Sequence, residues 1–94
     1  MVKHIVMWRL KEEAGVEDAR KIKELLERLK DICEGAIEIE VGIDTLKSSQ
    51  SFDVSLYSVF ESKEALEAYN THPEHLKAVD FIKSVVCERI AVDY

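Results

Sequence analysis

The sequence has few of the residues that build irregular or cross-linked proteins. It contains 1 proline, 3 glycines and 2 cysteines in 94 residues. Because 47% of the residues are hydrophobic and nothing is low-complexity, the composition excludes a disordered chain. Cys33 and Cys87 lie far apart, which argues against a secreted disulfide scaffold. We therefore expect two reduced thiols in a cytoplasmic protein.

The sequence also lacks an excess of positive charge and any long hydrophobic run. Its formal net charge is −6. Nucleic acids and anionic membranes bind basic surfaces, so we expect neither as a partner. The apolar start is too short for a signal peptide, since charge returns at Arg9, and no run is long enough to span a membrane. Without a glycine-rich phosphate loop or dinucleotide motif, we expect no cofactor.

Hydrophobic periodicity is what the sequence does contain. The length allows a single domain, residues 1–94. Alternating or β-branched apolar runs predict four strands, and apolar residues at helical spacing predict two helices between them. The expected strands are about 2–10, 37–44, 52–60 and 87–92. The expected helices are about 17–33 and 62–85, the second interrupted at Thr71-His72-Pro73.

Two segments carry the clearest patterns. Residues 17–33 present one apolar stripe, and Gly35 is a plausible helix stop. Residues 37–43 alternate between aliphatic and polar side chains, which is typical of a strand with one face in water. The helical stripe comprises Ile22, Leu25, Leu26, Leu29 and Ile32, and the aliphatic strand face comprises Ile37, Ile39, Val41 and Ile43.

The order β-α-β-β-α-β predicts an α+β fold with a four-stranded sheet. Two right-handed crossovers place the first and third strands in the centre and both helices on one face. The other face is left bare, and a small domain with a bare apolar face tends to associate. A second copy, packed sheet against sheet, is the simplest cover. The expected contacts are Ile5 and Met7 from the first strand and Tyr57 and Val59 from the third.

Three stretches of the chain carry a resemblance to a known family. They are Val2 to Trp8, Phe52 to Ser62, and Tyr69 to Leu76 with its His72-Pro73-Glu74-His75 element, and the closing Ile90 to Tyr94 fits the same family. They resemble the stress-responsive dimeric α/β-barrel domain, or Dabb domain, over essentially the whole chain. The resemblance implies a ferredoxin-like protomer with an antiparallel sheet, pairing into a dimeric α/β barrel. It implies no single activity: some plant members are associated with stress, and one branch resembles cofactor-independent polyketide cyclases.

The cyclase-like branch implies three pocket residues, which here are His4, Tyr69 and His75. That branch has a further histidine on the third strand, where this sequence has Val54. A histidine and a tyrosine at one pocket can remove a proton next to a carbonyl and stabilise the enolate. His75 is the candidate base, Tyr69 its orienting or oxyanion partner, and His4 a further polar contact.

Further ligand contacts are expected beside these residues. Trp8 shares a strand face with His4, and we include Val54 and Phe81 in the expected pocket. Each candidate also has a structural alternative, because core-facing tyrosines usually pack and histidines often bond locally. His72 and His75 have Pro73 between them and no third ligand at a suitable spacing, so we expect no metal site.

Three functions remain open at this point. The first is a homodimer that binds a small, mainly apolar molecule between sheet and helices. The second is a cofactor-independent cyclase or isomerase acting on a carbonyl compound, and the third is a stress-associated structural oligomer without a ligand. Val54 counts against a plant-type cyclase, and the set His4, Tyr69 and His75 counts against a purely structural role. A cavity lined by all three side chains would favour the first two functions.

Overall fold

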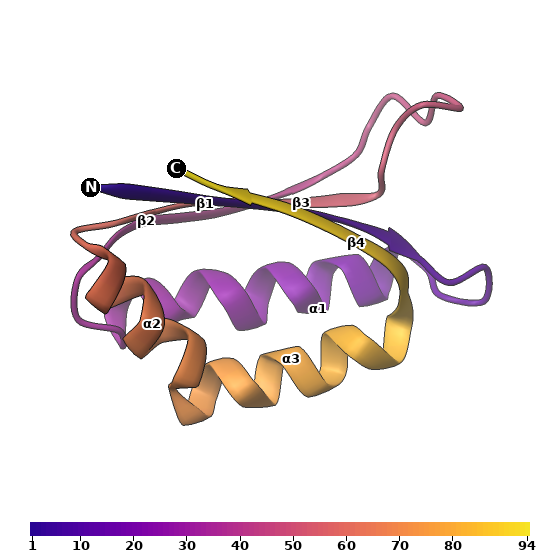
Figure 1. Ribbon diagram of the computed structural model, residues 1–94. Coiled ribbons are helices and arrows are strands. Elements are labelled where there is room, and N and C mark those ends of the chain that lie inside the picture. The colour runs from indigo at the N-terminus through magenta and orange to yellow at the C-terminus, as the bar shows by residue number, and fades with distance from the viewer.

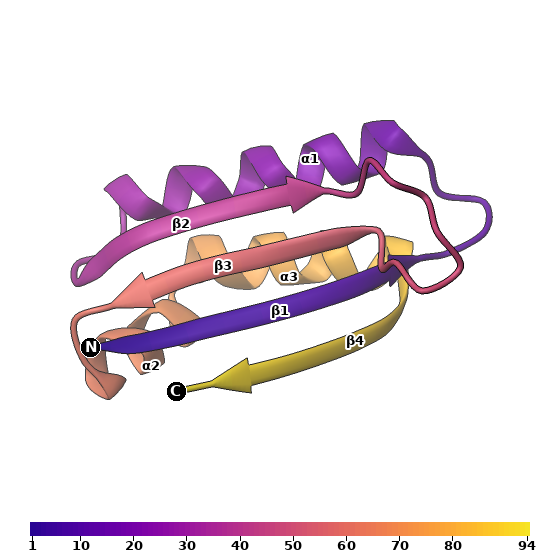
Figure 2. The same cartoon turned by 90° about the horizontal axis from the view of Figure 1, so that it is seen from above.

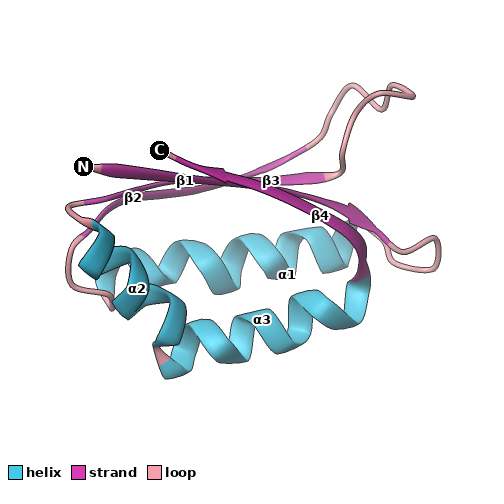
Figure 3. Cartoon of the chain, in the orientation of Figure 1, coloured by secondary structure: helices cyan, strands magenta, loops and turns pink.

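The fold has two layers, a four-stranded sheet and a layer of helices on one side of it (Figures 1 and 3). The computed structural model describes residues 1–94, and the expected α+β, ferredoxin-like class is confirmed. In chain order the elements are β1 (Val2–Leu10), α1 (Val16–Glu27), the 3₁₀ helix η1 (Arg28–Asp31), β2 (Ala36–Ile43), β3 (Val54–Phe60), α2 (Lys63–Thr71), α3 (Pro73–Val85) and β4 (Val86–Asp93).

The sheet has the strand order β2-β3-β1-β4, and every pair of neighbours is antiparallel (Figure 2). The first and third strands are therefore central, as predicted. In the register of β1, His4 lies opposite Ser58 on one side and Asp93 on the other. The sheet thus brings together residues from both ends of the chain.

The alternation of β1 decides which side chains meet the helices. Val6 and Trp8 are almost fully buried, and their β3 partners Leu56 and Val54 are buried with them. The helix layer adds Ile22, Leu26, Leu66, Tyr69, Ala78 and Ile82 to the same core. None of the helices is both long and apolar enough to cross a membrane.

The expected helix over residues 17–33 ends earlier than its apolar stripe. After Glu27 the chain tightens into η1, where Leu29 is fully buried and its carbonyl accepts from the amides of Ile32 and Cys33 at 3.1 and 2.8 Å. The tighter turn leaves Ile32 46% exposed and buries Cys33 in its place. Gly35 then takes a positive φ of 87° and turns the chain into β2.

One position of β2 also departs from the expected alternation. Ile37 is 41% exposed, whereas Ile39 and Val41 are buried. The register with β3 shifts between Ala36 and Glu38, so Ile37 lies in an irregular step of the ladder. The predicted aliphatic face therefore begins at Ile39.

The break between α2 and α3 is built from local capping. The Ser62 hydroxyl accepts from the Ala65 amide at 3.1 Å and starts α2. His72 ends α2 and caps α3, with its Nδ1 accepting from the Glu74 amide at 3.1 Å and Pro73 at the first helical position. Tyr69, near the end of α2, and His75, in the first turn of α3, consequently lie on either side of the bend.

The face of the sheet away from the helices is uncovered, and we call it the open face. Met7, Ile90 and Val92 on it are 39%, 47% and 55% exposed. Ile5 and Tyr57 are half-buried. Val59 was expected to contact a partner, but it is only 6% exposed within one chain and has little surface left to bury.

Candidate functional site

A cavity of about 270 Å³ lies between the helix-facing side of the sheet and helices α2 and α3, and we call it the sheet–helix cavity. Eight of its 13 lining residues are hydrophobic. This volume is slightly below the roughly 300–1,000 Å³ typical of sites for drug-sized ligands, so the space suits a small molecule. The lining comprises His4, Val6, Trp8, Leu26, Leu56, Tyr69, Asn70, His75, Val79, Ile82, Lys83, Val86 and Arg89.

Tyr69 lies at the centre of the polar part of this lining. Its ring centroid is 4.3 Å from that of His75, 4.9 Å from that of Phe60 and 6.5 Å from that of His4. The residue is fully buried, yet its hydroxyl has no hydrogen-bond partner. Burial raises the pKa of this hydroxyl, so it remains a proton donor at neutral pH.

His75 is held by the carbonyl of Asn70, which lies 3.0 Å from Nδ1. A carbonyl oxygen only accepts, so Nδ1 carries the proton and Nε2 of the neutral ring keeps its lone pair. Burial lowers the pKa of His75, the bond to Asn70 opposes this, and the charges of His4 and Arg89 lower it further. The ring is therefore neutral at pH 7, as a general base must be.

His4 is fixed from two sides on β1. Its Nδ1 contacts the carboxylate of Asp93, and its carbonyl accepts from the buried Ser58 hydroxyl at 2.7 Å. Because the carboxylate accepts, Nδ1 carries the proton and Nε2 is left for other contacts. Asp93 was not predicted as a site residue. The available signal was its place near the end of the last strand, which pairs with β1.

The remaining expected contacts divide into two groups. Trp8 lines the cavity together with His4, Tyr69 and His75. Val54 does not: it is buried in the core and lines the separate hollow beside the loop between β2 and β3. Phe81 does not either: its ring faces α1, where Lys21 Nζ lies 4.3 Å from the ring centroid. Lys83 and Arg89 line the cavity without having been expected.

Two other candidate chemistries find no support in this arrangement. No three histidine, cysteine or carboxylate side chains lie close enough to hold a metal ion, and His72 is used as a helix cap. Cys33 is buried, and burial raises the pKa of its thiol, which keeps it protonated and weakly nucleophilic.

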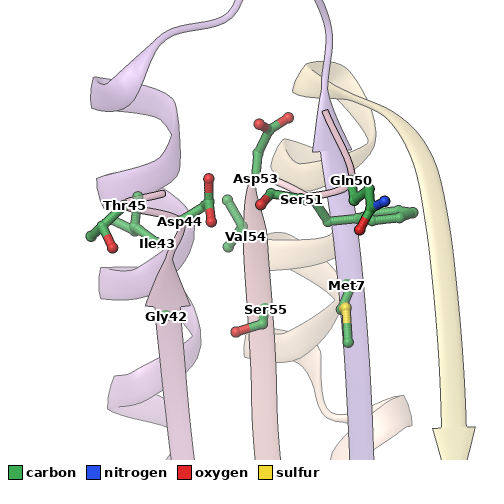
Figure 4. A pocket seen from close by; sticks show the side chains of 11 residues that line it. Met7, Gly42, Ile43, Asp44, Thr45, Gln50, Ser51, Asp53, Val54 and Ser55 are labelled. Carbon is green, nitrogen blue, oxygen red and sulfur yellow. The ribbon is translucent and has the colours of Figure 1, made fainter. Parts of the chain in front are cut away.

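A second hollow, of about 420 Å³, lies on the open face beside the loop between β2 and β3. Figure 4 shows Met7, Gly42 and Ser55 from three neighbouring strands, with Asp44 and Asp53 from the loop above them. Both carboxylates already hold the loop, because Asp53 accepts from the Leu10 amide and Asp44 from the Lys47 amide, each at 2.8 Å. This hollow offers no buried unpaired polar group, unlike the sheet–helix cavity.

Comparison with known sequences finds relatives over the whole chain. A family model described as the stress responsive A/B barrel domain matches residues 2–94. A stress-response A/B barrel domain-containing protein of Arabidopsis thaliana is 30% identical over 98 residues. The match takes in 100% of this chain but only 36% of that protein, so the chain spans well under half of the length of this relative.

Comparison with solved structures finds the same fold. A dimeric ferredoxin-like protein of unknown function from Bacteroides fragilis has a TM-score of 0.86 and 32% identity, over 99% of this chain and 93% of that one. A hydroxynitrile lyase from Passiflora edulis has a TM-score of 0.84 and 20% identity, over 99% and 90% of the two chains. At that identity the lyase shows a shared fold alone.

Proposed function

The chain belongs to the stress responsive A/B barrel domain family, and from this premise we propose that it is a homodimer that binds a small, mainly apolar molecule in the sheet–helix cavity. The apolar residues of the open face support a dimer, as does the dimeric relative from Bacteroides fragilis. The free thiols Cys33 and Cys87, the second of them exposed, suit a reducing compartment. We therefore propose that the protein resides in the cytoplasm.

The main observation in support of ligand binding is the unpaired hydroxyl of Tyr69. Leaving a buried hydroxyl without a partner costs about 1–3 kcal/mol. A small movement of the Tyr69 side chain that brings its hydroxyl to a ligand oxygen would remove this cost, while the apolar lining takes up the rest of the molecule. Three polar side chains from three different elements line this one space: His4, Tyr69 and His75.

Trp8 provides a direct test because it is the only tryptophan and it lines the cavity. We expect octanamide, an apolar chain with one carbonyl acceptor, to change Trp8 emission saturably. Tyr69→Phe should weaken that binding about five- to tenfold, the value of one hydrogen bond, without lowering the free energy of unfolding. Tyr57→Phe, on the open face, is the matched control. Unchanged Trp8 emission up to millimolar octanamide would favour the structural oligomer without a ligand.

A catalytic role is the second candidate, and the state of His75 favours it. With Nδ1 bound to Asn70, the Nε2 lone pair can take a proton from the carbon next to a ligand carbonyl. The C–H electron pair then moves to the carbonyl oxygen, and the enolate accepts a hydrogen bond from the Tyr69 hydroxyl. If the ligand carries a C=C bond conjugated with the enolate, return of the proton from Nε2 to the far carbon of that system completes an isomerisation. If the ligand carries a second carbonyl, attack of the enolate carbon on it closes a ring, and the resulting alkoxide takes the proton back from Nε2.

Proton abstraction can be measured without the natural substrate. Methyl hexyl ketone in deuterium oxide should exchange its α-protons faster with the protein than without it, as followed by NMR. His75→Gln should lower the protein-dependent rate by about 100-fold or more, while circular dichroism shows the fold intact. Equal exchange with the wild-type protein and the His75→Gln variant would exclude His75 as the base and leave ligand binding unaffected.

A further inference from the structure

We propose that the ligand of the sheet–helix cavity is an amphipathic carboxylate, with its anionic end held by Lys83 and Arg89 and its apolar part inside the cavity. The inference rests on the ligand-binding function proposed above and adds the chemical class of the ligand. It concerns two residues that stand outside the set His4, Tyr69 and His75.

Lys83 and Arg89 reach the same cavity from different elements. Lys83 lies in the last turn of α3, and Arg89 lies on β4 directly opposite Trp8 of β1. Both side chains are exposed, so they stand at the solvent side of the cavity while Tyr69 lies in its interior. Val86, also in the lining, connects the two elements.

The edge of the cavity carries positive charge, whereas the chain as a whole is negatively charged. The sequence has 19 acidic residues against 13 lysines and arginines, yet the cavity lining contains one lysine, one arginine and no aspartate or glutamate. Six ion pairs form in the chain, one of them between His4 of the lining and Asp93, and neither Lys83 nor Arg89 takes part in any of them. Unpaired cations beside an apolar wall attract an anion more strongly than cations surrounded by water.

Ordinary structural roles explain only part of this arrangement. A cation in the last turn of a helix is stabilised by the helix dipole, which accounts for Lys83 but not for Arg89. A charged side chain on an edge strand hinders edge-to-edge pairing, but Glu88 on the same strand already supplies such a charge on the opposite face. Neither role requires the two cations to share a cavity with an unpaired Tyr69 hydroxyl.

The shape and polarity of the site select a carboxylate. The planar guanidinium of Arg89 matches the two oxygens of a carboxylate, and Lys83 adds a second positive charge. A cavity of about 270 Å³ with eight hydrophobic lining residues suits an apolar chain or ring of modest size behind that group. The Tyr69 hydroxyl, in the interior, is then left for a second oxygen on the apolar part of a ligand that carries one.

Octanoate and octanamide test the proposal because they differ in little but charge. We expect octanoate to bind the wild-type protein about tenfold more tightly than octanamide, as measured by Trp8 emission, and added salt to reduce the difference. The Arg89→Gln,Lys83→Gln double variant should lose this preference and keep its affinity for octanamide within about twofold. The Arg20→Gln,Lys30→Gln double variant, which removes two exposed bases outside the cavity lining, is the control for net charge.

The possible outcomes separate this inference from the function on which it rests. If octanamide and octanoate bind equally to the wild-type protein, the carboxylate proposal is wrong and ligand binding stands. The carboxylate proposal is equally wrong if the preference for octanoate survives in the double variant. If neither probe changes Trp8 emission, the ligand-binding function itself fails, and with it this inference.

Discussion

At the scale of single residues, Tyr69 and His75 show how burial sets the chemistry of the cavity. Burial raises the pKa of the tyrosine hydroxyl and lowers that of the imidazole, because in both cases it disfavours the charged form. The result is a neutral donor and a neutral acceptor whose ring centroids lie 4.3 Å apart. Such a pair can bind or polarise a carbonyl oxygen without placing a net charge in the interior.

The depressed pKa of His75 predicts how stability depends on pH. The unfolded chain binds a proton near the ordinary value of 6.5, whereas the folded chain resists protonation, chiefly because the ring is buried. The unfolded state therefore binds more protons, and the free energy of unfolding falls as pH drops below 6.5. We expect His75→Gln to weaken the dependence of the free energy of unfolding on pH in this range, as measured by urea unfolding at a series of pH values.

Two carboxylates, those of Glu27 and Glu74, take up protons in a different range of pH. Burial alone would raise the pKa of Glu27, but hydrogen bonds with Lys23 and the Val41 amide lower it below the ordinary value of 4.5. A hydrogen bond with Lys77 lowers the pKa of Glu74 in the same direction. The stability that these two carboxylates contribute is therefore lost at a lower pH than the stability linked to His75. Glu27→Gln should therefore leave the region just below pH 6.5 unchanged. An identical slope in that region for the wild-type protein and His75→Gln would show that His75 is not the titrating group.

The site residues that the sequence could predict are those that lie in motifs. His4, Tyr69 and His75 stand in the stretches that carry the family resemblance. Asp93 and Arg89 could not be placed, because their roles depend on the register of β4 against β1, across more than 75 residues of chain. A shift of that register by one residue would turn both side chains to the open face.

At the scale of elements, the turn at Gly35 allows the chain to pass close to the first turn of α2. Gly35 has a positive φ, and a Cβ there would come within 2.6 Å of the Ala65 side chain. Its carbonyl also accepts from the Glu61 amide at 2.9 Å. The helix stop was predicted from the glycine itself, but its contact with α2 was not, because helix propensity carries no information on distant packing.

Gly35→Ala should consequently be one of the costly small substitutions in this chain. The unfavourable φ and the clash with Ala65 together predict a loss of about 2–4 kcal/mol in the free energy of unfolding. Gly15→Ala is the control, because a Cβ there meets nothing within 4 Å, and we expect it to cost less than about 1 kcal/mol. If urea unfolding gave the same loss of free energy for the two variants, the turn at Gly35 would have to accommodate a Cβ by small shifts of its neighbours.

At the scale of the whole molecule, the two faces of the sheet have separate tasks in our proposal. The helix-facing side holds His4, Trp8 and the cavity, and the open face holds Met7 and Ile90, which are neighbours in the ladder. The assignment of His4 and Trp8 to one face and of Met7 to the other was predicted from the alternation of β1. That Ile90 and Val92 are more exposed than Val59 was not, because side-chain exposure depends on neighbours in adjacent strands.

Separate faces imply that the dimer can be disrupted without loss of the cavity. Ile90→Glu places a carboxylate among the apolar residues Ile5, Met7 and Val92 of the open face, where a second copy would leave it desolvated and unpaired. We expect the dimer dissociation constant, measured by sedimentation, to rise by about 30-fold or more, as for an apolar residue buried in an interface. Octanamide binding to the resulting monomer should stay within about twofold of the wild-type value.

Leu76→Glu supplies the matched control for this substitution. Leu76 is 50% exposed on α3, close to the 47% of Ile90, but it lies in the helix layer and not on the open face. The same change in polarity and charge should therefore leave the dimer intact. A protein that sediments as a monomer without any substitution, or dissociates with Leu76→Glu and not with Ile90→Glu, would place the partner elsewhere. Loss of octanamide binding together with the dimer would instead show that the second copy helps to form the cavity.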